Sequence, residues 1–417
     1  VGFDPSAANR ITRAAQAAYA LNPIPELPAA RFNPAGGVLF AGPDRRSVAE
    51  TSAALFSPRL GVAWSPARWG RKSVFRAGFG VFYFTEGLIP SRQPGYFQRT
   101  PLVATLDGFL TTAATLSNPF PNGVLQPVGK TLGLDTFLGQ AVSVYNPVVD
   151  NPYSLRWNLT IQRELNRDLM FEVGYLGNHA VGLTVNRGLN WVPPQFLSQQ
   201  PVRDQAVIAR LTANVPNPFR GLLPGTALDG STIQVQQLLR PFPQFSGESG
   251  VALDADNFGS SYFHSLQARL EKRLSGGLAY LVNYQYSRLM EKRSFLNPFD
   301  AAPEKRVAAE DRPHYLVVSG VYELPFGQRK PLGSSAGPVL DRLIGGWSVS
   351  GFYAYSSGRT LGWGNVIYLG GGLNYDARRV EGTFDTSRFN TDSRQQLAMN
   401  IRSFPSRFNN LGGAAAN

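Results

Sequence analysis

A pattern of two alternating strands joined by a short turn recurs four times in this chain and limits the folds it can adopt. In the clearest copy, over residues 154–175, every second residue is apolar and most of those between are polar. The apolar set is Leu155, Trp157, Leu159 and Ile161, then, after a turn at 166–168, Leu169, Phe171, Val173 and Tyr175. Strict alternation is the period of a β-strand whose two faces meet different environments. The sequence therefore predicts antiparallel hairpins with one apolar face.

The four hairpins are expected at residues 58–84, 154–175, 262–287 and 314–356. Long connections at 86–152, 178–260 and 288–311 fall only between hairpins, never within them. Loops of this length are uncommon in compact soluble domains. Short turns at one end and long loops at the other are typical of a transmembrane β-barrel, with the turns periplasmic and the loops extracellular. We predict an all-β fold: an antiparallel transmembrane β-barrel of which this chain supplies part.

The flanking regions are less regular. Residues 1–57 read as a loop region with a short Ala-rich helix near 10–21, and a second helix is predicted at 203–213. Residues 359–417 read as a loop with further barrel strands near 366–368 and 379–384. The chain starts at Val1 rather than Met and stops without a closing aromatic strand. We therefore expect a piece of a longer protein with an incomplete C-terminus.

Composition favours the same class of protein. The chain has 43 Gly, 31 Pro and 12% aromatic residues, but only 16% charged residues, against about 25% in a typical soluble domain. It has no cysteine, which excludes disulfides and thiolate chemistry. The net charge is +12, yet the arginines are scattered singly, so we expect no nucleic-acid partner. They are expected instead to line a wet lumen or to face lipopolysaccharide phosphates.

Aromatic residues gather at one end of the predicted strands. Tyr83, Tyr175, Tyr284, Tyr286 and Tyr353 all lie where a returning strand approaches a long loop. Tyrosine suits a membrane–water boundary because its ring is apolar and its tip is polar. A soluble β-sandwich with cross-strand aromatic pairs is the alternative interpretation.

Several segments resemble the barrel of Oar-like TonB-dependent outer-membrane receptors. They are NPYSLRWNLTIQREL at 151–165, FEVGYLGN at 171–178, YFHSLQARLEKR at 262–273, DRPH at 311–314, GVYELPFG at 320–327, GGW at 345–347, SSGR at 356–359 and FSPRLG at 56–61. These matches cover most of residues 22–410.

The resemblance implies a barrel of about 22 strands, an N-terminal plug, a segment that contacts TonB and an additional N-terminal β-sandwich. About eight to ten strands are visible here, and the other parts are not. The implied function is energy-coupled uptake of an unidentified ligand across the outer membrane of a Gram-negative-type bacterium. The implied partners are outer-membrane lipid and lipopolysaccharide, the TonB system through a plug not present in this chain, and a small-molecule or oligomeric ligand such as an oligosaccharide or a siderophore.

No pattern predicts catalysis, so we expect no enzyme, catalytic residue, cofactor or metal site. His179, His264 and His314 lack the fixed spacing of metal ligands and are expected near the outer rim. Glu164, Glu271 and Glu323 lie near the inner ends of descending strands, and Glu172 lies on a rising strand. Salt bridges in the lumen are a better explanation of these residues than paired catalytic carboxylates.

The predicted ligand-binding residues are loop aromatics in polar, Gly- and Asn-rich surroundings: Trp191, Phe196, Phe242, Phe245, Trp363 and Tyr368. Flat aromatic faces with Asn and Arg side chains are a common means of holding sugars. The alternative is that these rings pack the loops against one another. For the whole protein, the alternatives are a plug-less outer-membrane channel or adhesin and a secreted β-rich glycan-binding protein.

Overall fold

The computed structural model describes most of the chain up to residue 360 and isolated stretches beyond it. The described residues are 1–43, 46, 50–51, 55–69, 72–84, 93–100, 102–105, 108, 110–146, 148–200, 202–247, 250–360, 367–368, 376, 379, 381, 385, 387, 389–390, 392 and 397–401.

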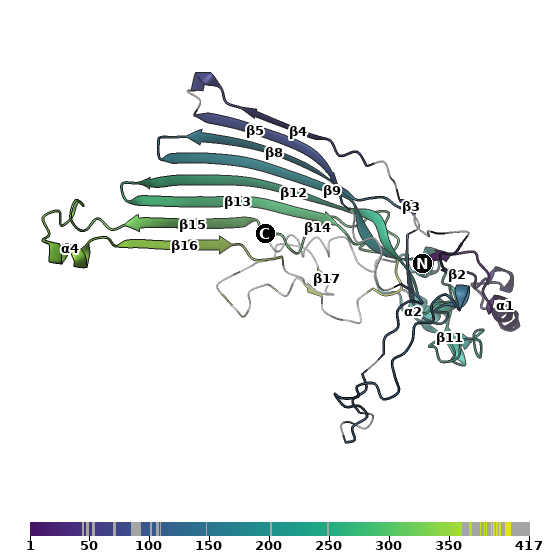
Figure 1. Ribbon diagram of the computed structural model, residues 1–417. Helices are drawn as coiled ribbons and strands as arrows, with labels where there is room; N and C mark the ends of the chain where they lie inside the picture. The colour runs from purple at the N-terminus through teal and green to yellow at the C-terminus, as the bar shows by residue number, and fades with distance from the viewer. Residues whose placement is uncertain are drawn as a thin grey trace.

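One large antiparallel sheet dominates the structure (Figure 1). Its strands lie in the order β16-β15-β13-β12-β9-β8-β5-β4. Their bounds are β4 Arg59–Trp64, β5 Ser73–Tyr83, β8 Tyr153–Glu164, β9 Leu169–Gly188, β12 Val251–Ser275, β13 Leu278–Lys292, β15 His314–Glu323 and β16 Ser348–Ser356. In the described part of the chain the sheet is open, with β4 and β16 at its edges. None of the described helices is both long enough and apolar enough to span a membrane.

The register brings the apolar positions of neighbouring strands onto a single face. One row of directly paired residues runs through Val62, Ala77, Leu159, Tyr175, Leu266 and Tyr286. The adjacent row, on the opposite face, runs through Ala63, Arg76, Thr160, Gly174, Gln267 and Gln285. Because paired residues in a ladder point to the same side, the alternation predicted for the hairpins becomes one apolar and one polar face across the six strands from β4 to β13. On β15 and β16 apolar residues lie on both faces, since Val317 and Ala354 share the face of Asn283.

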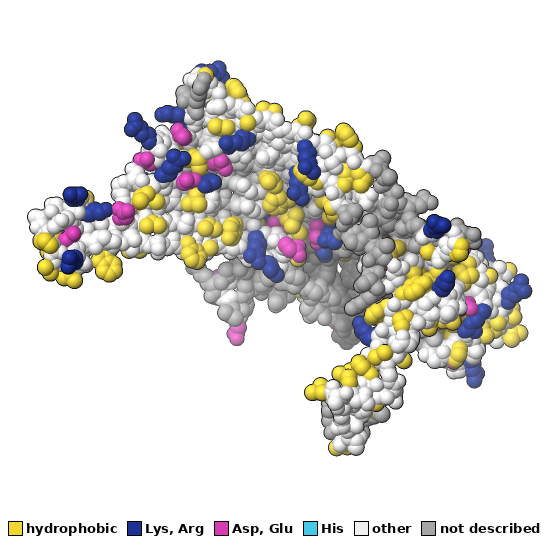
Figure 2. All heavy atoms as spheres, viewed as in Figure 1, with side chains coloured by type: hydrophobic (Ala, Val, Ile, Leu, Met, Phe, Trp, Pro, Cys, Tyr) yellow, Lys and Arg dark blue, Asp and Glu magenta, His cyan; other side chains and the backbone are white. Residues whose placement is uncertain are grey.

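The strand connections separate by length, as the sequence predicts. The turns within the hairpins all lie at one end of the sheet (Figure 1). Gly276 and Gly277 both have positive φ, 61° and 78°, the conformation of a two-residue type I′ hairpin turn. The two longer turns contain the 3₁₀ helix η2 (Ala67–Trp69) and the helix α4 (Pro338–Ile344). The long connections leave from the other end, which we call the loop end. Figure 2 shows many charged side chains near the hairpin turns, with hydrophobic ones along the strands.

Two central strands extend well beyond the predicted hairpins. β9 continues to Gly188 and β12 begins at Val251, so residues 178–188 and 251–260 are strand rather than loop. The pairing of β9 with β12 is irregular between Leu253 and Ser260. Gly182, with φ of 73°, lies at one of these irregularities. A bulge adds a residue to one strand and breaks the period of two, which hides this extension from the sequence pattern.

The N-terminal region and parts of the long connections fold into a compact unit at the loop end, which we call the loop domain. Its elements are β1 (Gly2–Asp4), α1 (Thr12–Leu21), η1 (Ala29–Arg31), β2 (Gly37–Leu39), η3 (Gly133–Asp135), η4 (Pro194–Phe196), α2 (Gln205–Thr212), β10 (Asn214–Pro216), β11 (Thr232–Gln234) and α3 (Val235–Leu238). Ala15, Leu211 and Phe219 are among its fully buried core residues. β6 (Val142–Tyr145) pairs in parallel with the start of β12 and joins this unit to the sheet. Short strands complete the structure: β3 (Glu50–Thr51), β7 (Val148–Val149), β14 (Arg306–Val307), β17 (Ile367–Tyr368) and β18 (Phe389–Asn390).

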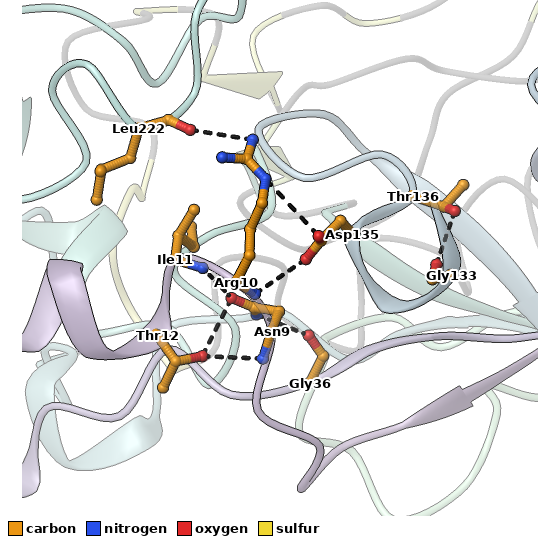
Figure 3. Close-up of polar contacts among 9 residues, drawn as sticks. All are labelled: Asn9, Arg10, Ile11, Thr12, Gly36, Gly133, Asp135, Thr136 and Leu222. Atoms are coloured by element: carbon orange, nitrogen blue, oxygen red, sulfur yellow. Dashed lines mark hydrogen bonds and ion pairs between the residues drawn. The ribbon is translucent and has the colours of Figure 1, made fainter. Parts of the chain in front are cut away.

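Polar contacts join distant segments of the loop domain (Figure 3). The side chain of Asn9 accepts hydrogen bonds from the backbone N–H of Ile11 and the hydroxyl of Thr12, where α1 begins. The backbone N–H of Arg10 donates to Asp135 at 3.0 Å, and its guanidinium donates to the carbonyl of Leu222 at 3.3 Å. One short segment therefore contacts parts of the chain more than 100 residues away.

Candidate ligand-binding site

The structure separates the six predicted ligand-binding aromatics. Trp191, Phe196, Phe242 and Phe245 lie in or beside the loop domain. Trp363 lies outside the described residues, and Tyr368 is described only as a backbone position in β17. The structure therefore does not bring the six together as one site.

Three of these rings contribute to the hydrophobic core. Phe245 is 0% exposed, and Phe196 and Phe242 are partly buried against the same cluster. Phe3 contacts both Phe242 and Phe245 edge-on, with ring centroids 4.9 and 5.8 Å apart. Phe245 thus has no surface to offer a ligand. Its polar surroundings in sequence suggested exposure, but the packing of distant segments buries it.

Trp191 differs from the other three because it lines two cavities. They have volumes of about 580 and 640 Å³ and lie where β9 meets the loop domain. Arg187 lines both, Arg293 and Phe295 line the first, and Arg240 lines the second. We call this region the junction site. Its volumes lie within the range of small-molecule pockets, about 300–1,000 Å³.

Charge and aromatic rings are combined at the junction site. The guanidinium carbon of Arg187 lies 5.6 and 5.7 Å from the ring centroids of Phe258 and Phe295, which is cation–π geometry. Arg187 also forms a 4.0 Å ion pair with Asp256. Burial raises the pKa of Asp256, and the charge of Arg187 and a hydrogen bond from Asn146 oppose that shift. Arg187 therefore contacts two aromatic rings and one buried carboxylate at this site.

A buried asparagine positions the chain around Trp191. Asn190 is 0% exposed, and its amide nitrogen lies within 3.2 Å of the carbonyls of Phe242, Phe245 and Gly247. Its side-chain oxygen accepts the backbone N–H of Phe242 at 2.8 Å. A guanidinium nitrogen of Arg240 donates to the Asn190 carbonyl at 2.6 Å. These bonds hold residues 240–247 against the segment that carries Trp191.

Comparison with known proteins assigns the architecture. The family model for the outer membrane beta barrel domain matches residues 2–409. The chain belongs to this family. Its location is therefore the outer membrane, and the secreted alternative is wrong.

Solved structures give weaker similarities. The outer membrane transporter YddB from Escherichia coli is 9% identical, with a TM-score of 0.34, and the match covers 78% of this chain and 31% of YddB. The toluene transporter TodX from P. putida is 11% identical, with a TM-score of 0.22, covering 64% of this chain and 50% of TodX. The chain thus spans half or less of either neighbour. No curated protein matches it.

In an outer membrane β-barrel, outward-facing apolar residues meet lipid and the interior is polar. The row through Leu159 and Leu266 is therefore assigned to lipid, and the row through Thr160 and Gln267 to the lumen. Charged groups on the lumen side are paired in part: Arg269 contacts Glu271 at 2.7 Å. Near a hairpin turn, Lys330 contacts Glu323 at 2.9 Å.

Each of the three histidines lies beside a tyrosine on the apolar face, toward the loop end. The hydroxyls of Tyr175 and Tyr284 lie 2.7 and 2.8 Å from Nδ1 of His264 and His314. His179 stacks on Tyr262 with ring centroids 4.1 Å apart. Among the described residues, no cluster of histidine and acidic side chains fits a metal ion.

The sequence did not predict the arginines and Phe295 of the junction site. Arg187 lies beyond the irregularities of β9, in a region interpreted as loop, and Arg293 and Phe295 follow β13. Single arginines beside aromatics in Gly-rich sequence carry no distinctive spacing. Only the three-dimensional meeting of these segments identifies the site.

Proposed function

We propose that this chain is the barrel portion of a TonB-dependent outer-membrane transporter that takes up a ligand by energy coupling. The observation that carries the proposal is the single apolar face formed in register by the six strands β4, β5, β8, β9, β12 and β13. Such a sheet suits the wall of a lipid-embedded barrel, and its other face is polar. The Oar-like sequence segments support the TonB-dependent subtype.

The proposed mechanism has three steps. The ligand is captured at the loop end, a plug carried elsewhere in the parent protein rearranges when TonB acts on it, and the ligand then passes along the polar lumen. No residue of this chain is assigned covalent chemistry. Transport competence is proposed for the parent protein, because the strands that the structure describes form an open sheet.

We propose the junction site as the point of capture, with Trp191 as its aromatic contact. A flat ring beside guanidinium groups suits an oligosaccharide, whose ring has an apolar face rimmed by hydroxyls. It also suits a siderophore that carries anionic oxygens. Trp363 and Tyr368 remain proposed ligand contacts from the sequence.

Lipopolysaccharide is the proposed partner of the outer rim. Lys305 Nζ lies 5.6 Å from the ring centroid of Tyr262, whose other neighbour is His179. Lys292, at the end of β13, pairs in register with Ser260, two residues before Tyr262. Lysines and tyrosines at this level fit the phosphates and the boundary of the outer leaflet.

The function is tested by growth of the source bacterium on single nutrients. Deletion of the gene should abolish growth on one oligosaccharide or one ferric siderophore supplied as the sole carbon or iron source. Disruption of the TonB system should cause the same loss. A requirement for the gene without a requirement for TonB would contradict the proposal and favour a plug-less channel. No requirement in either class of nutrient would favour an adhesin.

A further inference from the structure

A row of paired residues crosses the lumen face of the sheet near the loop end. It runs through Arg59, Gly80, Arg156, Asn178 and Phe263, on β4, β5, β8, β9 and β12. Each member lies four residues along its own strand from a member of the polar row. The pairs are Arg59 and Ala63, Gly80 and Arg76, Arg156 and Thr160, Asn178 and Gly174, and Phe263 and Gln267. All of them therefore share the face of the polar row. We call this set the wall row.

Two arginines of the wall row share one aromatic ring. The guanidinium carbons of Arg59 and Arg156 lie 4.6 and 5.2 Å from the ring centroid of Phe82. Gly80 makes this arrangement possible, because a Cβ there would lie 2.8 Å from the Phe82 ring. Any larger residue at that position would displace the ring from the space that the two arginines use.

The guanidinium of Arg156 is oriented by a chain of two hydrogen bonds through Ser154 and Asn178. Its Nε donates to Ser154 Oγ at 3.1 Å, and that hydroxyl donates to the side-chain oxygen of Asn178. Ser154 is only 2% exposed, whereas Arg156 is exposed to the lumen. The terminal nitrogens of the guanidinium are therefore directed by a fixed support rather than left to a mobile side chain.

The wall row has positive charge without countercharge. In the part of the chain that the structure describes, neither Arg59 nor Arg156 forms an ion pair with a carboxylate, whereas Arg269 pairs with Glu271. Both arginines line a cavity of about 620 Å³ whose other walls include Leu176, Phe263 and Leu289. Two guanidinium groups thus face a space that is otherwise largely apolar.

We propose that the wall row is an anion-binding subsite of the lumen wall. It would take the carboxylate, sulfonate or phosphate group of a ligand whose remaining body is apolar. Guanidinium groups bind such anions through charge-assisted hydrogen bonds, and the apolar walls would bury the body. The inference rests on the proposed transport function and narrows the class of ligand. A neutral oligosaccharide has no anionic group to bind the two guanidinium groups.

The test uses the purified full-length protein and two matched probes that differ in charge. 4-Fluorobenzenesulfonate and the neutral 4-fluorobenzenesulfonamide are titrated by ¹⁹F NMR line broadening. We expect the sulfonate to bind about tenfold more tightly than the sulfonamide, the difference that charge-assisted hydrogen bonds typically supply. The double variant Arg59→Gln/Arg156→Gln should lose that preference.

The matched control is Arg76→Gln, which removes a guanidinium from the same face but one that is bonded to Gln162 at 2.8 Å. This control should keep the full preference for the sulfonate over the sulfonamide. The double variant Arg59→Lys/Arg156→Lys, which retains both positive charges, should keep part of it. Heat-modifiable migration on gels checks that each variant is folded. Equal binding of the two probes by the wild-type protein, or an undiminished preference in the double Gln variant, would overturn the subsite. Because binding to purified protein needs no TonB, that failure is distinct from failure of the growth test.

Discussion

At the scale of single residues, burial decides which aromatics pack and which bind. Phe245 is fully buried, whereas Trp191 is half-buried against a cavity. We expect Phe245→Ala to destabilise the loop domain by about 3–5 kcal/mol, the usual cost of removing a buried ring. Trp191→Ala should change stability far less. Hydrogen exchange of residues 235–245 in the full protein measures the difference, and equal losses of protection would contradict it.

The burial of Asp256 makes the stability depend on pH, and the direction of its pKa shift sets the sign. Burial raises its pKa, so the folded state holds the proton at pH values where the unfolded chain has released it. The stability from this group is present below its ordinary value of about 3.9 and is lost as pH rises through the folded pKa.

Asp256→Asn keeps an oxygen for the hydrogen bond from Asn146 and removes the titration. We expect the variant to be at least as stable as the wild-type protein at pH 7. Its stability should also fall less between pH 4 and pH 7, as measured by unfolding of the full protein in urea. An unchanged pH slope would show that another group is responsible.

At the scale of elements, the two faces of each strand differ in what they tolerate. Leu159 and Thr160 are neighbours on β8 with opposite orientations. We expect Leu159→Arg to cost about 2–4 kcal/mol, the price of an arginine facing the bilayer midplane. Thr160→Arg, facing the lumen, should cost little. Equilibrium folding of the full protein into lipid vesicles compares the two, and equal costs would contradict the assignment of faces.

The hairpins could be predicted because the sequence pattern that specifies each one lies within a single continuous segment of the chain. In three of the four, a period of two and the turn lie within residues 58–84, 154–175 and 262–287, and the fourth, at 314–356, has a longer turn. The four predicted hairpins correspond to β4–β5, β8–β9, β12–β13 and β15–β16. The loop domain could not be predicted in this way. Its core joins Ile11, Leu138, Phe219 and Val251, which are far apart in sequence and share no periodic pattern. The far ends of β9 and β12 were hidden by bulges.

At the scale of the whole molecule, the sheet and the loop domain have different structural roles. The sheet supplies the lipid-facing wall and the polar lumen face, and the loop domain covers one end of it (Figure 1). The two are continuous, since β12 pairs with β13 in the sheet and with β6 beside the loop domain. The junction site and the wall row both lie toward the loop end of the sheet.

The most direct test of this account is a labelling scan of the two faces. The chain has no cysteine, so single Cys substitutions at positions 159, 270 and 282 and at their neighbours 160, 269 and 283 can each carry one spin label. In the full protein in lipid bilayers, the first three labels should be relaxed by oxygen dissolved in the lipid. The other three should be relaxed by a water-soluble nickel chelate. The reverse pattern, or equal access of both reagents at all six positions, would contradict the claim that this sheet is a barrel wall with its apolar face in lipid.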